Sequence, residues 1–437
     1  MSQPSKGGDP TSASSYGSPA YSWYVILLLA AVYACHALDR GLPSILIEPI
    51  RAEFSLSDSQ LGLFSLAYAA AFSSAVLPMG YLADRVVRRN MLALIVLLWS
   101  AMTAFGGIAR NYAQLIAIRF GVGATEAGAA PLALPMISDM VPPGKRSFAL
   151  GIFYISSPVG GLLASVVGAY VAADHGWRAA FLVAGLPGIL LAALLYFTVR
   201  EPKRGGSDAG GATAEKPPGP LECFAFLFRT PALFCLMCAC ALMGLMNITI
   251  GFWMSSFFIR LHEVSLKETG LILGIGGGLI GMASPPITGW LADRFGARSI
   301  YWPLRIVWIS ALLSFGFTLA MLSTGSLVIA VVCFVIADFM RLGYSPPTYA
   351  VLMTNTPPRM RGSVMSVLQL MTNIVGYGIG PAVTGLMSDL YGGGTGIKPA
   401  LFNVSFVFLA VAGLLMLSNR LLYGRRPPGV TPAAATA

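Results

Sequence analysis

The stretch Gly80-Tyr-Leu-Ala-Asp84-Arg85-Val-Val-Arg88-Arg89 decides how this chain is organised, because it returns 209 residues later as Gly289-Trp-Leu-Ala-Asp293-Arg294-Phe-Gly-Ala-Arg298. A second pair repeats at a similar offset: Pro142-Pro-Gly-Lys-Arg-Ser returns 215 residues later as Pro357-Pro-Arg-Met-Arg-Gly-Ser. In each pair, the two copies follow apolar runs that occupy equivalent positions in the two halves of the chain. Two such pairs at equivalent places indicate a duplicated unit that contains several helices.

The composition identifies the medium in which this unit folds. Of the 437 residues, 56% are hydrophobic and 11% are charged, and the mean hydropathy is +0.73. One soluble core cannot bury so large an apolar excess, so we predict an integral membrane protein. Apolar runs of about 20 residues, long enough to cross a bilayer, begin near Trp23, Gln60, Met91, Tyr112, Phe148, Arg178, Ala232, Thr269, Tyr301, Leu327, Val364 and Leu401. The predicted fold is all-α, with twelve transmembrane helices in two pseudo-symmetric six-helix bundles.

Charge and composition also predict the domain limits and the topology. We expect a disordered tail over 1–21 with no cleaved signal, a bundle over 22–200, a Gly/Ala/Pro-rich linker over 201–220, a bundle over 221–424, and a tail over 425–437. Most Lys and Arg residues lie in the tails and in the loops after even-numbered spans, which places both termini in the cytoplasm of a cell (inner) membrane protein. The net charge of +10 therefore reflects topology, and no nucleic-acid partner is predicted.

Several other classes of protein find no support in the sequence. Three of the six cysteines, Cys235, Cys238 and Cys240, share an apolar run without His or carboxylate neighbours, so we interpret them as small hydrophobic residues and predict neither a metal site nor disulfides. No G-x-x-x-x-G-K-[ST] sequence exists to bind ATP. The three histidines are scattered and form no catalytic set, so no enzyme and no cofactor is predicted.

Two opposite charges, Arg119 and Glu126, interrupt the apolar run from Tyr112 to Met140. Seven positions bring both residues to one face of a helix, about 10 Å apart along its axis. A charged side chain at this depth costs a few kcal/mol or more unless it faces a cavity or a partner. We therefore interpret the two residues as part of a functional site.

The first span carries a second set of polar residues: Tyr33, His36, Asp39 and Arg40. Pro43 clashes with the carbonyl four residues back, so we expect the helix to kink or open at Asp39. Helix depth places Asp39 about 25 Å above the cytoplasmic end of its span.

The depths of the two charged sets agree. Arg119 lies about 10 Å below the outer end of its span, so we expect Asp39 to pair with Arg119 and Glu126 to lie level with His36 or Tyr33. A movement that brings Arg119 toward Glu126 or Asp39, or takes it away, could switch that carboxylate between releasing and binding a proton. Proton coupling through Asp39, Glu126 and Arg119 is the hypothesis. The alternative is a static salt-bridge network that only fixes helix packing.

The second half supplies fewer charges. Asp338 and Arg341 lie three positions apart, and Arg341 follows Glu126 by the same 215 residues that separate the second pair of repeats. Guanidinium groups pair well with phosphate and carboxylate. Amides in apolar runs are as consistent with interhelical hydrogen bonds as with substrate contact. The candidate substrate ligands are Arg40, His36, Tyr33, Asn247, Arg341, Gln369 and Asn373.

The repeated loops suggest a gate on the cytoplasmic side. Asp84 and Asp293 end their helices, where a carboxylate can approach the N-terminus of a helix in the other half, worth about 0.3–1 kcal/mol. Such contacts would hold this side shut. The alternative is ordinary solvated loop charge. The predicted gate comprises Gly80, Asp84, Arg85, Arg88, Arg89, Gly289, Asp293, Arg294 and Arg298.

The repeated loop resembles the G-x-L-A-D-R-x-G-R-R motif of the major facilitator superfamily, with Val87 in place of a glycine and Ala297 in place of a basic residue. Within that superfamily the first half looks most like the spinster family of lipid transporters. The likeness rests on His36-Ala-Leu-Asp39-Arg40, Arg119-x6-Glu126-Ala, Ser147-x5-Phe153-Tyr154, Pro158-Val-Gly160 and Arg200-Glu201-Pro202.

The spinster resemblance implies a lysolipid or sphingoid phosphate as substrate, protons as the coupling ion and alternating access as the mechanism. The same Asp-Arg and Arg-x6-Glu patterns also resemble proton-coupled symporters of sugar acids and carboxylates. An apolar cavity tolerates a lipid tail better than a hydroxylated sugar, so we favour the amphiphile. A passive lipid scramblase is the alternative of another class, and a monomer is expected.

Overall fold

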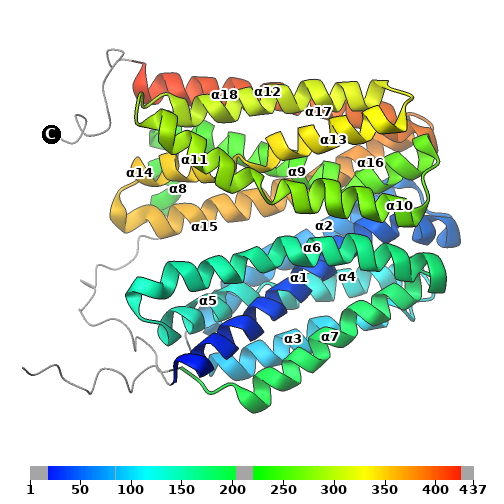
Figure 1. The fold of residues 1–437 in the computed structure, drawn as a ribbon, viewed down its shortest axis with the longest axis horizontal. Helices are drawn as coiled ribbons and strands as arrows, with labels where there is room; N and C mark the ends of the chain where they lie inside the picture. Colours follow the sequence, from blue (N-terminus) through cyan, green and yellow to red (C-terminus); the bar gives the residue numbers. More distant parts are fainter. Residues whose placement is uncertain (1–17, 84, 203–219, 425–437) are drawn as a thin grey trace, which may run out of the picture.

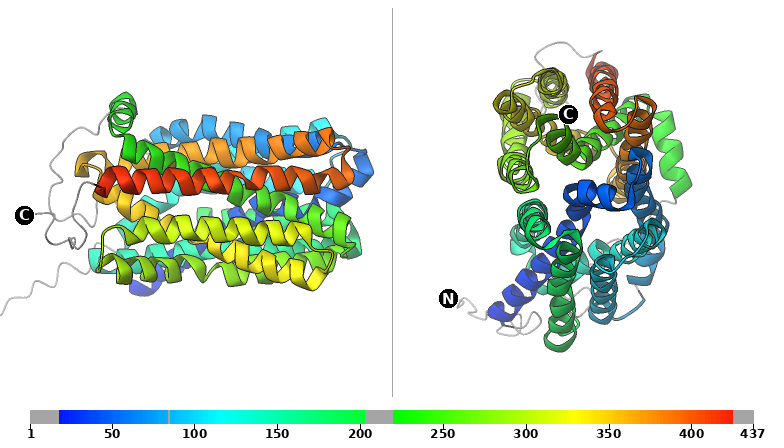
Figure 2. Two further views of the ribbon diagram at one scale, coloured as in Figure 1. Left: turned by 90° about the horizontal axis from the view of Figure 1, so that it is seen from above. Right: turned by 90° about the vertical axis from the view of Figure 1, so that its right-hand side faces the viewer.

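The computed structural model describes residues 18–83, 85–202 and 220–424. The first six spans form one bundle and the last six form another, and the two bundles lie side by side with their helices roughly along one axis (Figures 1 and 2). We call the end at which α1 begins and α18 ends the termini side, and the opposite end the far side. The predicted tails and linker, 1–21, 201–220 and 425–437, fall largely outside the described residues.

The first bundle contains six spans, of which the fourth is made of two helices. The elements are α1 (Pro19–Phe54), α2 (Asp58–Ala83), α3 (Arg88–Gly106), α4 (Tyr112–Glu126), α5 (Ala129–Met140), the 3₁₀ turn η2 (Pro143–Lys145), α6 (Arg146–His175) and α7 (Trp177–Thr198).

The second bundle contains the other six spans, preceded by the short helix α8. Its elements are α8 (Pro220–Arg229), α9 (Pro231–His262), α10 (Leu266–Leu271), the π-helix η3 (Ile272–Leu279), α11 (Ser284–Gly296), α12 (Trp302–Ser323), α13 (Leu327–Leu342), α14 (Ser345–Thr354), the 3₁₀ turn η4 (Pro358–Met360), α15 (Arg361–Thr372), the π-helix η5 (Asn373–Ile379), α16 (Gly380–Leu390), the 3₁₀ turn η6 (Gly394–Gly396), α17 (Ile397–Ser405) and α18 (Val407–Tyr423).

The sequence prediction of twelve spans is confirmed. Each expected start lies within four residues of a helix start in the structure. In the described part of the chain, ten helical segments are long and apolar enough to cross a membrane. The pairs α4–α5 and α15–α16 complete the twelve. Hydropathy gives the spans directly because every span must present apolar side chains to lipid or to another helix.

Proline interrupts the fourth and tenth spans at equivalent places. Pro131 has no N–H for the carbonyl of Ala127, four residues back, and α4 ends at Glu126 while α5 starts at Ala129. Pro346, 215 residues later, follows the break between α13 and α14. A helix end therefore lies beside Glu126 in the first bundle and beside Arg341 in the second.

The sequence predicts that the first span kinks or opens at Asp39, and the structure shows that it does not open. Helix α1 runs from Pro19 to Phe54 without interruption, with Pro43 inside it. The carbonyl that Pro43 leaves without a helical donor is that of Asp39, and Arg119 Nη1 donates to this oxygen at 3.3 Å. A side chain of another helix thus replaces the lost bond, as happens in membrane helices that contain proline.

Each bundle joins its own first and last spans at the termini side. In the first bundle the Tyr21 hydroxyl donates to the Thr198 carbonyl at 3.3 Å, and the Tyr24 and Thr198 hydroxyls lie 2.6 Å apart. In the second bundle the Ser418 hydroxyl of α18 donates to the Ala232 carbonyl of α9 at 2.8 Å. The first and last spans of each bundle are therefore in contact at the termini side.

The two bundles meet through the far-side parts of their helices. The main contacts between bundles join α2 to α16 and η5, α6 to α10 and η3, and α1 to α9. Glycine allows backbones to touch here: a Cβ on Gly62 would lie 2.7 Å from both Ala382 Cα and the Pro381 carbonyl oxygen. On the termini side, α5, α11, α14 and α15 make their main contacts within their own bundles.

Replacing Gly62 by valine should therefore separate the bundles on the far side. Overpacking of this kind costs about 1–3 kcal/mol, which we expect to shift the population toward a form open on the far side. Hydrogen exchange at the start of α2 and the end of α16 should rise. Gly413→Val is the control, because a Cβ on Gly413 meets nothing within 4 Å; equal exchange in both variants would contradict the prediction.

Candidate transport site

A cavity of about 260 Å³ lies between the two bundles. Both bundles contribute to its wall. The polar part of the lining comes from α1, α2, α4, α6, α9 and η5 and includes His36, Arg40, Tyr68, Arg119, Asn247 and Tyr377. Apolar rings, among them Phe64 and Phe252, form much of the rest. The structure thus brings His36, Arg40 and Arg119 of the predicted first-half site to one cavity, while Asp39 and Glu126 lie outside its lining.

Glu126 is the most deeply buried acid beside the cavity, with 1% of its surface exposed. The Tyr68 hydroxyl donates to its Oε2 at 2.7 Å, and His36 Nε2 lies 3.5 Å from the same oxygen. Tyr33 stacks on the His36 ring with centroids 5.1 Å apart. Glu126 is therefore level with His36, as the helix geometry predicts. Its Oε1 has no hydrogen-bond partner in the described part of the chain, which leaves room for a proton.

Asp39 and Arg119 also meet, but through the main chain. Arg119 donates to the Asp39 carbonyl, while the buried Asp39 Oδ1 has no hydrogen-bond partner among the described residues. The guanidinium carbon of Arg119 lies 5.1 Å from the Tyr68 ring centroid. The depth argument therefore placed the two residues correctly, and it did not foresee that the partner of Arg119 is the carbonyl freed by Pro43.

Arg40 is held by aromatic rings. Its guanidinium carbon lies 4.1 Å from the Tyr377 ring centroid, 5.4 Å from that of Tyr68 and 5.6 Å from that of Phe72. Cation–π contacts orient a guanidinium without neutralising its charge. Its Nε is buried and has no hydrogen-bond partner within the residues described. Arg40 is thus a cation at the cavity wall that is available to an anion.

The candidates of the second half divide into two groups. Asn247 lines the cavity, and its Oδ1 has no hydrogen-bond partner in the described ranges. Arg341, by contrast, forms an ion pair with Asp338 and donates to the Met246 carbonyl at 3.4 Å. Gln369 is exposed on α15, and Asn373 is buried at the start of η5. The structure therefore places Asn247 beside the first-half site and keeps the other three outside the cavity lining.

The first copy of the predicted gate holds the first bundle together. Arg88 Nη1 lies 2.7 Å from Asp139 Oδ2, and the N–H groups of Arg88 and Arg89 donate to the Glu201 carboxylate at 3.1 and 2.8 Å. Glu201 thus caps the N-terminus of α3, an arrangement that stabilises a helix. Its place in Arg200-Glu201-Pro202, directly after the sixth span, was the only signal in the sequence.

Among the remaining gate residues, the arginines contact aromatic rings of their own bundle. Arg85 stacks on Tyr81 at 3.4 Å, and Asp84 lies outside the described residues. In the second copy, Asp293 is exposed, and it lines with Gly289 a separate hollow of about 760 Å³ within the second bundle. Arg294 and Arg298 lie over neighbouring aromatic rings, at 5.4 and 5.6 Å. The predicted contacts across the halves remain predictions for a conformation closed on the termini side.

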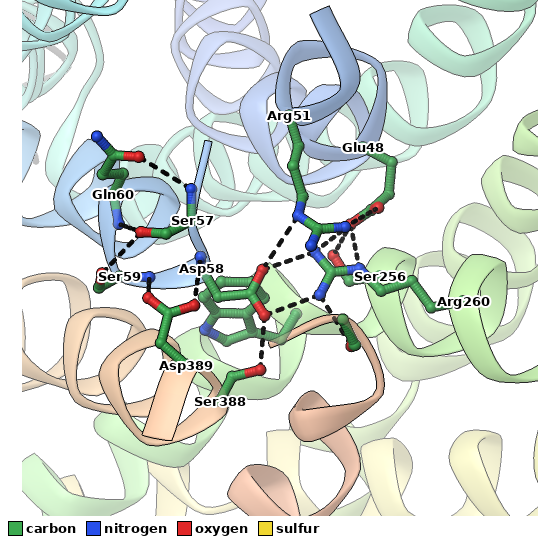
Figure 3. Close-up of polar contacts among 12 residues, drawn as sticks. Glu48, Arg51, Ser57, Asp58, Ser59, Gln60, Ser256, Arg260, Ser388 and Asp389 are labelled. Carbon is green, nitrogen blue, oxygen red and sulfur yellow. Dashed lines mark hydrogen bonds and ion pairs between the residues drawn. The ribbon is translucent and has the colours of Figure 1, made fainter. Parts of the chain in front are cut away.

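A polar network closes the far side instead, and we call it the far-side latch: Glu48, Arg51, Asp58, Arg260, Ser388 and Asp389 (Figure 3). Arg260 of α9 donates to both oxygens of Asp58 at 2.9 and 2.8 Å and to Glu48 of α1 at 2.9 Å. Asp58 has no exposed surface and also accepts the Ser388 hydroxyl at 2.6 Å. Bidentate Arg–carboxylate pairs of this kind are strong and directional.

Asp389 completes the far-side latch by capping a helix of the other bundle. Its carboxylate accepts the N–H groups of Asp58 and Ser59 at 2.9 and 2.8 Å, where α2 begins. A carboxylate at a helix N-terminus satisfies unpaired donors and interacts favourably with the helix dipole. The far-side latch therefore joins α1 and α2 of the first bundle to α9 and α16 of the second.

Two bundles of six helices around a cavity that is closed at one end define a membrane transport protein. The chain belongs to the Major Facilitator Superfamily, whose family model matches residues 29–307 and 282–437. It is a transporter and not an enzyme.

Relatives confirm the resemblance to spinster proteins. The crystal structure of a bacterial homologue of the human lysosomal transporter Spinster, inward-facing and unoccupied, matches with a TM-score of 0.85 at 27% identity and covers 95% of this chain and 100% of that chain. An "MFS-type efflux pump" of Mycolicibacterium smegmatis is 29% identical over 402 residues, 89% of each chain. A "Probable L-galactonate transporter" of Escherichia coli is 28% identical over 276 residues, 61% of each chain.

Proposed function

We propose that this protein is a proton-coupled secondary transporter that works by alternating access and moves an amphiphilic anion such as a lysolipid or a sphingoid phosphate. The observation that carries the proposal is the combination of Arg40, a cation at the cavity wall without a carboxylate partner in the described residues, with Glu126, a buried acid that contacts the lining residues His36 and Tyr68. The first can hold an anionic headgroup, and the second can hold a proton.

The amphiphilic character of the substrate follows from the cavity wall. A guanidinium fork suits phosphate, while Phe64, Ile248 and Phe252 offer an apolar surface to a chain. The volume of about 260 Å³ lies just below the range of about 300–1,000 Å³ usual for ligand pockets, so we propose that it holds the headgroup and only the first part of a tail. The resemblance of the first half to the spinster family of lipid transporters implies the same substrate class.

Topology and membrane belong to the proposal. We assign the termini side to the cytoplasm of a cell membrane protein because Lys and Arg concentrate there. The far-side latch then closes the outer face, and the structure corresponds to an inward-facing form. The spinster homologue, itself inward-facing, supports this assignment. The protein is proposed to act as a monomer, with no cofactor besides the coupling proton.

Transport of small organic anions is the second candidate. The polar groups His36, Arg40 and Asn247 at the cavity would also suit a sugar acid, and the L-galactonate transporter is among the relatives. A passive lipid scramblase would use the same cavity without protons. The three functions differ in the substrate that moves and in whether a proton moves with it.

Pure protein in liposomes that contain a pH-sensitive dye can separate these functions. We expect lysophospholipids or sphingoid-base phosphates to cause proton movement, and Arg40→Gln to weaken the response about 10- to 150-fold, the equivalent of one hydrogen bond to a charged group. Arg305→Gln is the control, because Arg305 also stacks on aromatic rings, Tyr301 and Trp302, but does not line the cavity.

Each alternative predicts a different result in this assay. Proton movement with small carboxylates alone would assign the protein to the organic-anion symporters, with Arg40 and Arg119 as the anion ligands. Lipid flux that ignored the pH gradient would indicate a scramblase. Equal losses in Arg40→Gln and Arg305→Gln would remove Arg40 from the binding site.

A further inference from the structure

Tyr68 of α2 occupies a position that the proposed function leaves without a role. Only 2% of its surface is exposed, yet the side chain reaches the cavity wall. Its backbone is fixed, because Gly123 of α4 lies against the Tyr68 carbonyl so closely that a Cβ would clash with it. A ring held in place at the wall can act only through the groups that it touches.

Those groups are the three charges on which the proposed function depends. The Tyr68 hydroxyl donates to Glu126 at 2.7 Å. Its ring centroid lies 5.4 Å from the guanidinium carbon of Arg40 and 5.1 Å from that of Arg119. One side chain thus binds the buried acid with its polar end and both cations with its ring.

We propose that Tyr68 is the positioning residue that links the protonation of Glu126 to anion binding at Arg40. The inference rests on the proposed function. When Glu126 is ionised, the charge-assisted hydrogen bond is strong and fixes the ring beside the two arginines. When Glu126 is protonated, the bond is weaker and the ring is less restrained, so Arg40 is freer to turn toward an anion. The hydroxyl proton stays on Tyr68 throughout.

Other titratable and charged groups around Glu126 also influence its protonation. The groups that face it come from α1, α2 and α4, and they are Tyr33, His36, Asp39, Arg40, Tyr68 and Arg119. A purely Coulombic link between Glu126 and Arg40 needs no hydroxyl on residue 68. A link through the hydrogen bond requires one, and this difference can be tested.

Linkage is reciprocal: if proton uptake favours anion binding, anion binding favours proton uptake by the same factor. We therefore expect the wild-type protein to bind a short-chain sphingoid 1-phosphate at least about tenfold more tightly near pH 5 than near pH 8, a coupling within the usual range. The probe itself titrates near pH 6. The titration of the probe contributes equally to the affinity ratio of every variant, so a difference between variants reports the titration of the protein.

Tyr68→Phe removes the hydroxyl and keeps the ring. We expect this variant to bind the probe at low pH about as tightly as the wild type, with the ratio between the two pH values reduced to about threefold or less. Tyr377→Phe is the matched control. Its ring also lies on Arg40, at 4.1 Å, and within the residues described its hydroxyl makes no hydrogen bond, so the wild-type ratio should persist.

Glu126→Gln should reduce the ratio of the two affinities as Tyr68→Phe does. The double variant should reduce it no further, because both changes remove the same link. A wild-type ratio in Tyr68→Phe would overturn the inference and leave the proposed function intact. Loss of the ratio in both tyrosine variants would also overturn it, since the ring environment would then be responsible. Absence of binding in every form would instead reject the amphiphilic substrate of the proposed function.

Discussion

Proton-driven transport should fall to background in Glu126→Gln, while exchange of labelled for unlabelled substrate continues at a reduced rate. Glutamine keeps an oxygen that can accept the Tyr68 hydroxyl, but it cannot titrate. Exchange needs only binding and the conformational change, whereas uphill transport also needs a proton that binds on one side and leaves on the other. Parallel assays of gradient-driven uptake and exchange in liposomes measure the two quantities.

Glu222→Gln serves as the control for this variant, because Glu222 pairs with Arg359 at 3.2 Å in an exposed position at the termini side. Exposed pairs of this kind contribute about 0–1 kcal/mol, so both activities should be unchanged. An equal loss of uptake and exchange in Glu126→Gln would show that Glu126 packs the helices or binds substrate and does not carry the proton.

The second large effect is expected at the far-side latch. Arg260→Ala would leave Asp58 and Glu48 with only their longer ion pairs to Arg51, at 3.6 and 4.0 Å, and the Asp58 side chain has 0% exposure. Breaking a buried pair in this way costs about 3–5 kcal/mol. The carboxylates can regain water if the bundles part on the far side, so the population should shift toward that open form. Hydrogen exchange at the start of α2 and the end of α16 reports the shift.

Arg178→Ala is the matched control for Arg260→Ala. Arg178 of α7 pairs with Glu53 of α1 at 2.5 Å on the same side, but within the first bundle and partly exposed. Its loss removes an ion pair without removing a contact between bundles. If both variants raised exchange equally, the far-side latch would be no more than a set of local ion pairs.

Most of the fold could be predicted from sequence because each membrane helix can be recognised independently of the others. Each span is a continuous apolar run, and the repeated loops order the runs into two equal sets. The positions at which helices break were harder to predict. Pro43 and Pro131 look alike in sequence, yet only the second coincides with a helix break, because Arg119 satisfies the carbonyl that Pro43 leaves free. Such compensation depends on a residue from another helix.

The candidate site was predictable only where charge interrupts an apolar run. Glu126, Arg119 and Arg40 are conspicuous for that reason. Tyr68 is not conspicuous, because a tyrosine in an apolar helix is ordinarily interpreted as a packing residue. Its role becomes visible only in the structure, where its hydroxyl donates to Glu126. Arg260 and Asp58 lie at helix ends, where charge is ordinarily solvated. Their pairing joins residues 202 positions apart, which no local pattern encodes.

The joined ends of each bundle bear on how such a chain can arise. Tyr21 and Tyr24 meet Thr198 in the first bundle, and Ser418 meets Ala232 in the second, so each six-helix unit begins and finishes at neighbouring points on the same face. A gene for one unit can then be copied and fused in tandem by a short connector, with no helix rerouted and no topology inverted. An even number of spans is what makes that fusion possible, since an odd number would leave the two ends on opposite sides of the bilayer.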